Sequence, residues 1–369
     1  MRIGAPRETA QGETRVALVV ETVQRLVRSK HEVMVQAGAG EAAGFPDAAY
    51  RDAGAKVVAD PLALAREADV FICVQKPGEA ETKALRQGSV VIGMLQARTD
   101  PAAVKALAAQ GVTAFSMELV PRIARAQKLD VLSSQASIAG YKAVLIGASA
   151  LGKYFPMLMT AAGTVPPAKV LVLGAGVAGL QAIATARRLG AVVEAYDVRP
   201  AVKEQVESLG ARFVELPQVA GAEAAGGYAR EQTAEEQARQ RELLKKHVGA
   251  SDVVITTAAV PGRKAPLLVT EDMVDAMRPG SVIVDLAAET GGNVAVTKAA
   301  QVVMRNGVAV HGPVNVSASM PWHASQLYSR NVMGLLDLII DKEGVLKLDF
   351  ADEVVAAMCV AHAGEVRVK

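Results

Sequence analysis

Three glycines at a fixed spacing are the residues that indicate a particular chemistry most clearly. Gly174, Gly176 and Gly179 form the pattern G-x-G-x-x-G between an apolar run, residues 170–173, and a segment with helical periodicity. In this pattern the first glycine permits a tight turn, the second lets the backbone approach a pyrophosphate, and the third lets helix pack on strand. The free N–H groups at the start of such a helix attract an anion. The spacing therefore predicts a dinucleotide-binding turn.

An acidic residue follows this turn at the distance that dinucleotide-binding proteins use. Asp197 ends the next apolar run, residues 191–196. A carboxylate in that place accepts hydrogen bonds from the adenosine ribose and repels a 2′-phosphate, so it favours NAD over NADP. Arg199 stands two positions later and weakens that preference. The alternative, a glycine turn that serves only packing, is disfavoured by the strand, helix and acid around it.

A second concentration of ligand-type side chains lies earlier in the chain. Pro121 ends an apolar strand pattern, and polar residues then crowd the next positions. They are Arg122, Arg125, Gln127, Lys128, Asp130, Ser133, Ser134 and Gln135. Such a segment is either a solvated loop or a ligand-facing loop on a rigid scaffold. Arg15 and Lys76, at the edges of apolar strands, are likewise either surface charges or anion-binding groups.

The elements that must position these residues alternate between strand and helix patterns. In the first third, strands are predicted at residues 2–5, 32–36, 56–58, 70–74, 90–95 and 112–118, with helical or alanine-rich segments such as 19–27 and 101–109 between them. This alternation is typical of a parallel sheet with helices on both faces. A long helix from about Ser137 is expected to cross into a second domain.

The second domain begins with the glycine turn. Further strands are predicted at residues 211–216, 252–258, 281–285 and 308–312, and an apolar helix at 328–340. The connection at 217–248 is unusually long. Its glycines around Tyr228 predict a mobile lid, with a disordered surface insertion as the alternative.

These patterns together predict an α/β fold of two Rossmann-like, doubly wound parallel-sheet domains. The domains are joined by long helices, with NAD in the cleft. The expected boundaries are 1–134 plus 322–369 for the N-terminal domain and 135–321 for the NAD-binding domain.

Composition excludes several classes of protein. The 369 residues carry a formal net charge of +2, so nothing indicates nucleic-acid binding. The most suspicious apolar run, residues 332–340, contains Asp337 and is far too short to span a membrane. Cys73 and Cys359 are the only cysteines, both in apolar surroundings, which predicts buried free thiols and no Cys-x-x-Cys metal or redox motif. No signal peptide and no metal site are expected.

At the loop from Arg122 to Asp130 the chain resembles the alanine dehydrogenase/pyridine nucleotide transhydrogenase family. The motifs that carry the resemblance are PRETAQGETRVAL, PRIARAQKLDVLSSQ, GAGVAGLQAI with YDVRP, GGYA and SVIVDLAAETGGN, between Met1 and about Asp341. Within the family the likeness is to the soluble NAD-binding subunits of proton-translocating transhydrogenases. It implies hydride transfer between NAD(H) on this chain and NADP(H) on a partner, coupled to proton translocation.

The resemblance also implies which partners and residues take part. The expected partners are a second copy of the chain, a transmembrane subunit and an NADP-binding beta subunit, on the cytoplasmic face of the inner membrane. Arg122, Gln127 and Asp130 would hold the dihydronicotinamide, Ser133 its carboxamide, and Tyr228 would close the lid. The full set of implied NAD-binding residues is Arg122, Ile123, Ala124, Arg125, Gln127, Asp130, Ser133, Gly174, Gly176, Val177, Gly179, Asp197, Val198, Arg199, Gly227, Tyr228 and Ala258.

Two alternatives remain. An alanine dehydrogenase of the same family would use Arg15 and Lys76 for pyruvate, but its catalytic histidine would fall at Gln96 and its aspartate at Glu289. A glutamine cannot act as a general acid or base near neutral pH, which disfavours this reading. Direct hydride transfer between two nicotinamides needs no such group. A non-catalytic NAD-sensing module is the second alternative, and turnover with a second nicotinamide carrier would exclude it.

Overall fold

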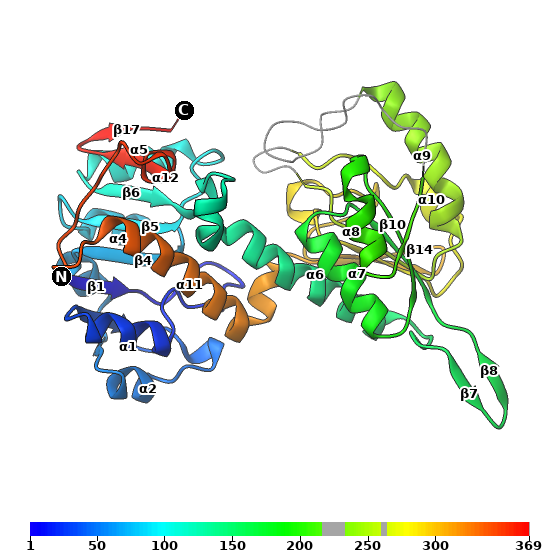
Figure 1. Ribbon diagram of the computed structural model, residues 1–369, viewed down its shortest axis with the longest axis horizontal. Helices are drawn as coiled ribbons and strands as arrows, with labels where there is room; N and C mark the ends of the chain where they lie inside the picture. Colours follow the sequence, from blue (N-terminus) through cyan, green and yellow to red (C-terminus); the bar gives the residue numbers. More distant parts are fainter. Residues whose placement is uncertain (216–232, 260–263, 369) are drawn as a thin grey trace. The chain divides into compact units, whose positions relative to one another are not determined.

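The protein contains two compact units, each built around one sheet (Figure 1). The computed structural model describes residues 1–215, 233–259 and 264–368. The first unit comprises Met1–Gln135 and Ser317–Lys369, and the second comprises Ala136–Val316. The expected lid, with Gly227 and Tyr228, lies outside the described residues. The sequence-based boundaries stay predictions of where independently folding domains begin and end.

The first unit holds an eight-stranded sheet in the order β17-β16-β6-β5-β4-β1-β2-β3. Its strands are β1 (Arg2–Ala5), β2 (Glu32–Gln36), β3 (Lys56–Val58), β4 (Val70–Gln75), β5 (Val90–Met94), β6 (Thr113–Ser116), β16 (Cys359–His362) and β17 (Glu365–Val366). Strands β1 to β6 run parallel, whereas β16 pairs antiparallel with β6 and β17 antiparallel with β16. The C-terminal tail therefore completes the edge of the sheet that the first 116 residues begin.

Helices and short 3-10 turns connect these strands. They are α1 (Val20–Arg28), α2 (Asp47–Asp52), α3 (Pro61–Glu67), α4 (Glu79–Ala84), α5 (Pro101–Ala109), α11 (Pro321–Ile339), α12 (Glu353–Met358), η1 (Glu41–Ala43), η2 (Met117–Leu119) and η3 (Ala124–Leu129). Helices α3 and α5 both begin with a proline behind an aspartate that accepts a hydrogen bond from a first-turn N–H group. This pairing sets the helix start, because it satisfies a free donor and uses the proline where its missing N–H costs nothing.

The second unit holds a seven-stranded sheet in the order β11-β10-β9-β12-β13-β15-β14. Its strands are β9 (Lys169–Leu173), β10 (Val192–Tyr196), β11 (Arg212–Phe213), β12 (Val253–Thr256), β13 (Val282–Asp285), β14 (Gln301–Arg305) and β15 (Val308–Gly312). Only β14 runs antiparallel among these strands. The chain builds outward from β9 on one side and then resumes at β12 on the other. Ligands of open α/β sheets bind at such a reversal.

The connections of the second unit are α7 (Val177–Arg188), η4 (Pro200–Val202), α8 (Lys203–Ser208), α9 (Ala234–Gly249), α10 (Glu271–Asp275) and η5 (Ala288–Thr290). Helix α6 (Val131–Ala150) contains the boundary between the units, which falls after Gln135. Its second half lies so close to α7 that a Cβ atom on Gly140 would stand 2.0 Å from the Ala178 carbonyl oxygen. The chain returns to the first unit within η6 (Val316–Ser319).

One element was not anticipated from the sequence, a hairpin of β7 (Leu158–Thr160) and β8 (Gly163–Val165) that extends away from the second sheet (Figure 1). Its strands are three residues long and largely exposed, so they lack the alternation by which a strand is recognised. The strand predicted at 211–216 is also shorter than expected. No helix in the described ranges is long and apolar enough to cross a membrane.

Candidate nucleotide site

The glycine turn lies between β9 and α7, at the reversal of the second sheet. Gly174 has a φ of +101°, which side chains rarely adopt. A Cβ atom on Gly179 would stand only 1.8 Å from the Gly174 carbonyl oxygen, so packing requires this glycine. Gly176 differs, because its φ is −77° and a Cβ atom there would meet nothing within 4 Å. The protein itself does not require a glycine at this position, which fits the close approach of a ligand to the backbone.

Neighbouring loops hold the turn in place. The Thr257 hydroxyl donates to the Gly174 carbonyl oxygen at 3.0 Å. Asn293 is fully buried and bonds both backbone groups of Ala258, donating to its oxygen at 2.8 Å and accepting from its N–H at 3.1 Å. Sequence analysis included Ala258 but missed Thr257 and Asn293 as positioning residues. Their position directly after predicted strands was the available signal.

Asp197 lies at the end of β10, where the sequence placed the ribose-binding acid, and is buried. One carboxylate oxygen accepts from the Ala175 N–H at 2.7 Å and the other from the Arg199 N–H at 2.9 Å. The Arg199 guanidinium bonds both oxygens, at 2.9 Å and 2.8 Å. Val198 is half-buried between them, and Val177, in the first turn of α7, is exposed. The structure thus gathers the turn, the acid and Arg199 within the second unit.

The polar loop from Arg122 to Asp130 belongs to the first unit, where it forms η3. Ala126 and Leu129 are fully buried and anchor it, whereas Arg122 and Gln127 are exposed. The Asn331 amide of α11 donates to the Lys128 carbonyl oxygen at 2.8 Å, and its oxygen accepts from the Ser134 hydroxyl at 2.7 Å. Exposed side chains therefore stand on a backbone that is fixed on both sides, as a ligand-facing loop requires. Sequence analysis missed Asn331, which is remote in sequence.

Two other residues of this loop have partners within the first unit. Asp130 precedes α6 and accepts from both the N–H and the hydroxyl of Ser133, at 2.9 Å and 2.6 Å. It thereby caps the helix. Arg125 makes a bidentate bond to Asp352 at 2.6 Å and 2.9 Å, and this bond lowers the pKa of the Asp352 carboxyl to about 2. Ile123 and Ala124 connect these groups; Ile123 is half-buried and Ala124 exposed.

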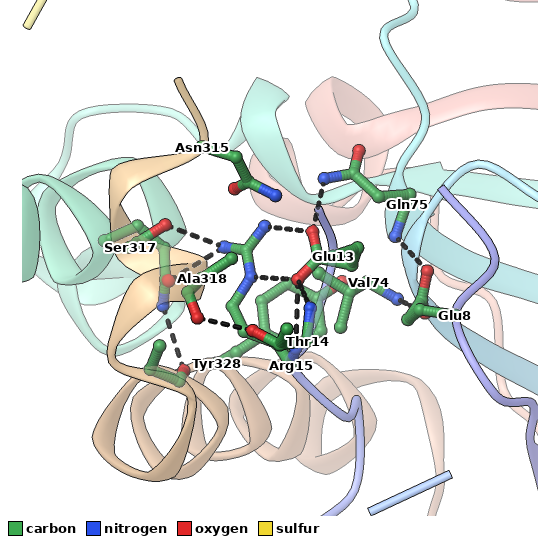
Figure 2. A network of polar contacts seen from close by, with 12 residues as sticks. Glu8, Glu13, Thr14, Arg15, Val74, Gln75, Asn315, Ser317, Ala318 and Tyr328 are labelled. Atoms are coloured by element: carbon green, nitrogen blue, oxygen red, sulfur yellow. Dashed lines mark hydrogen bonds and ion pairs between the residues drawn. The ribbon is translucent and has the colours of Figure 1, made fainter. Parts of the chain in front are cut away.

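A buried polar network occupies the loops that follow β1 and β4 (Figure 2). Arg15 is only 3% exposed, and its guanidinium bonds both carboxylate oxygens of Glu13, at 2.7 Å and 2.6 Å. It also donates to Gln135 at 2.8 Å and to Ser317 at 3.1 Å. Gln75 connects the network to Glu13 at 2.8 Å. Arg15 is thus enclosed by partners from its own unit.

Glu8 lies beside this network and behaves as an internal anion. Its two oxygens accept from the N–H groups of Val74 and Gln75, at 2.5 Å and 3.1 Å. Burial raises the pKa of Glu8 to about 7, against the lowering effect of these two hydrogen bonds. For Glu13, burial also acts to raise the pKa, but the bonds and charge of Arg15 outweigh it and hold the value below the usual range.

A pocket of about 180 Å³ lies next to Glu8, lined in part by Cys73, Gln75, Lys76 and Gln96. Lys76 is paired with Asp100. Gln96 is therefore close to the lysine that the alanine dehydrogenase alternative would use, but its amide has no proton to exchange. Both cysteines are buried free thiols. The described residues contain no group of three or more His, Cys, Asp or Glu side chains arranged to hold a metal.

Comparisons with known proteins cover nearly the whole chain. Residues 4–139 match the description "Alanine dehydrogenase/PNT, N-terminal domain" and residues 143–369 the description "Alanine dehydrogenase/PNT, C-terminal domain". The chain is 46% identical to the first of the chains that form the alpha subunit of the Rhodospirillum rubrum NAD(P) transhydrogenase, over 99% of this chain and 97% of that protein. It is 31% identical to an alanine dehydrogenase of Bacillus subtilis, over 94% and 87% of the two chains.

A solved structure agrees with these matches. The crystal structure of a transhydrogenase from Sinorhizobium meliloti superposes with a TM-score of 0.90 at 46% identity, over 99% of this chain and 100% of that one. The predicted Rossmann-like α/β fold class is thereby confirmed, with antiparallel strands at the edge of each parallel sheet.

Proposed function

The chain belongs to the alanine dehydrogenase/pyridine nucleotide transhydrogenase family, and on this premise we propose that it is the NAD(H)-binding subunit of a proton-translocating NAD(P) transhydrogenase of the Si/Re-specific type. The observation that carries the proposal is the glycine turn at the reversal of the second sheet, beside the buried carboxylate of Asp197. The 46% identity to a transhydrogenase alpha subunit over the full chain supports it.

In this proposal the side chains bind and orient the nucleotide, while the nicotinamide supplies the hydride chemistry when bound. Backbone N–H groups at the start of α7 would bind the pyrophosphate, and Asp197 the adenosine ribose. Arg122, Gln127 and Asp130 would orient the dihydronicotinamide, and Ser133 its carboxamide, as the family resemblance implies. Orientation matters because reacting atoms must approach to about 3–3.5 Å, and a misplacement of about 1 Å can cost about 100-fold in rate.

The remaining functions would belong to partner chains. We place NADP(H) on a beta subunit and the proton path in transmembrane subunits, so that this chain docks at the cytoplasmic face of the inner membrane. We also propose a homodimer. The hairpin β7–β8 supports a second copy, because Met157, Met159 and Tyr154 expose large apolar side chains on and beside it. Exposed apolar groups that gather on a projecting element are typical of protein interfaces.

Nucleotide binding by the pure protein is the first test. We expect NADH to bind much more tightly than NADPH, and Asp197→Ala to weaken NADH binding. Equal affinity of the wild type for the two nucleotides would refute the assignment. Alanine-dependent reduction of NAD should be undetectable, because Gln96 stands where the dehydrogenase needs a histidine.

The hydride step is the second test. The pure protein should not reduce an NADP analogue with NADH, whereas adding an isolated NADP-binding domain should start the reaction. Gln127→Asn shortens the side chain by one methylene and should slow this step, measured by stopped flow, while changing NADH affinity little. Gln87→Asn is the matched control, since Gln87 is exposed and precedes β5, at the opposite edge of the sheet from the loops that follow its strands. An unchanged rate in Gln127→Asn would rule out its orienting role.

A further inference from the structure

We propose that Arg199 sets the nucleotide preference of this site by competing with the adenosine ribose for Asp197 and, once displaced, by favouring a 2′-phosphate. The inference rests on the proposed function, because it concerns the nucleotide that the glycine turn would bind. It concerns a side chain that a simple reading of the acid at the end of β10 treats as secondary.

The hydrogen bonds of Asp197 carry the argument. One carboxylate oxygen accepts from the Arg199 N–H and Nε, both at 2.9 Å. The other accepts from the Ala175 N–H at 2.7 Å and from the Arg199 Nη2 at 2.8 Å. An ionised carboxylate offers about four lone-pair sites, so these four donors fill it. A ribose hydroxyl can therefore bond Asp197 only after one of the present donors has left.

The guanidinium is the donor group that can leave. Two of the four donors are backbone N–H groups, in the glycine turn and directly after β10, whose positions the fold determines. The other two belong to the Arg199 side chain, which rotates about its own bonds. NADH binding must consequently break a charged, bidentate pair whose side chains are only 16% and 6% exposed, and this cost lowers NADH affinity.

The same pair changes the discrimination against NADP(H). While Arg199 is bonded to Asp197, the charge of the carboxylate is neutralised, so it repels a phosphate less than a free aspartate would. After displacement, the arginine backbone remains held by its N–H bond to Asp197. The guanidinium thus stays within one side-chain length of the ribose position. There it can form the bidentate contact with a 2′-phosphate that arginine makes well.

Equilibrium binding of NADH and NADPH to the full chain tests the proposal in wild type, Arg199→Gln and Arg199→Lys. Arg199→Gln should bind NADH several-fold more tightly and NADPH about tenfold or more weakly, as expected for the loss of one charged hydrogen bond. Arg199→Lys keeps the charge but loses the bidentate geometry, so NADH should again bind more tightly while NADPH weakens less than in Arg199→Gln. Arg305→Gln is the control, because Arg305 lies on β14, at the opposite end of the strand order, and pairs with Asp275 there.

The outcomes separate this proposal from the one on which it rests. A wild-type protein that binds no NADH overturns the proposed function. A wild type that binds NADH, with unchanged or weaker NADH affinity in Arg199→Gln, overturns only the role of Arg199. If Arg199→Gln does not fold, Arg199→Lys decides, and unchanged affinities for both nucleotides then contradict the proposal.

Discussion

The two sheets follow the same parallel design but differ in what occupies the loops at their reversal points. In the second unit, between β9 and β12, small residues line the turn, and a side chain at Gly176 would meet nothing. In the first unit, between β1 and β4, the carboxylate of Glu8 already bonds the backbone N–H groups of Val74 and Gln75. The first reversal therefore carries its own anion, whereas the second leaves room for an external one. Sheet topology creates the location, and the loop side chains decide whether a ligand can use it.

The largest effect should come from removing the cation of the first unit. Arg15→Met leaves the carboxylate of Glu13, which is 0% exposed, without its guanidinium. Breaking a buried pair in this way typically costs about 3–5 kcal/mol in the free energy of unfolding. Urea denaturation measures the loss. Arg25→Met is the control, since Arg25 and Asp337 are exposed and such pairs contribute about 1 kcal/mol or less. Equal losses in the two variants would mean that the network is not structural.

A smaller effect is expected in the glycine turn of the second unit, where the readout is NADH affinity. Gly179→Ala forces the Gly174 carbonyl oxygen to move and should weaken NADH binding about 100-fold or more, close to 3 kcal/mol. Gly176→Ala meets no protein atom, so its thermal stability should equal that of the wild type. Its NADH affinity should nevertheless fall, because the new methyl group would stand where the pyrophosphate approaches. Wild-type affinity in Gly176→Ala would contradict the comparison of the two reversal points.

The smallest effect concerns the internal anion. The pKa of Glu8 is raised from 4.5 to about 7, so between these pH values the folded protein keeps a proton that the unfolded chain releases. The contribution of Glu8 to stability is thus fully present below pH 4.5 and is lost as pH rises to about 7, on the order of 2 kcal/mol. Glu13, with its lowered pKa, has the opposite effect, which lies below this window.

Chemical denaturation at pH 5, 6, 7 and 8 tests this contribution. Glu8→Gln cannot titrate and should remove the part of the pH dependence between pH 5 and 7. Glu32→Gln, an exposed change of the same kind on β2, should leave it intact. A wild-type slope that survives in Glu8→Gln would assign the titration to another group.

Much of the fold could be predicted because its signals are local. Apolar runs bounded by glycine and proline identified β1, β2, β3 and β15 with the bounds that the structure has, and Asp-Pro marked the start of α5. The start of α6 was missed because Ser133, Ser134 and Gln135 look like a loop, although Asp130 caps a helix that begins at Val131. The hairpin β7–β8 was missed because its exposed strands carry no periodicity.

The sequence by itself determined the fold class, the family and the place of the glycine turn, since each depends on residue types at short, regular spacing. Tertiary structure decided how the charged groups are paired. Arg15 is enclosed by Gln135 and Ser317, which are far away in sequence, and Asn331 fixes the loop that carries Gln127. Arg199 lies only two positions from Asp197, but its bidentate bond depends on the directions of both side chains at the end of β10. Spacing along the chain does not determine these partners, because hydrogen bonds depend on distance and angle in three dimensions.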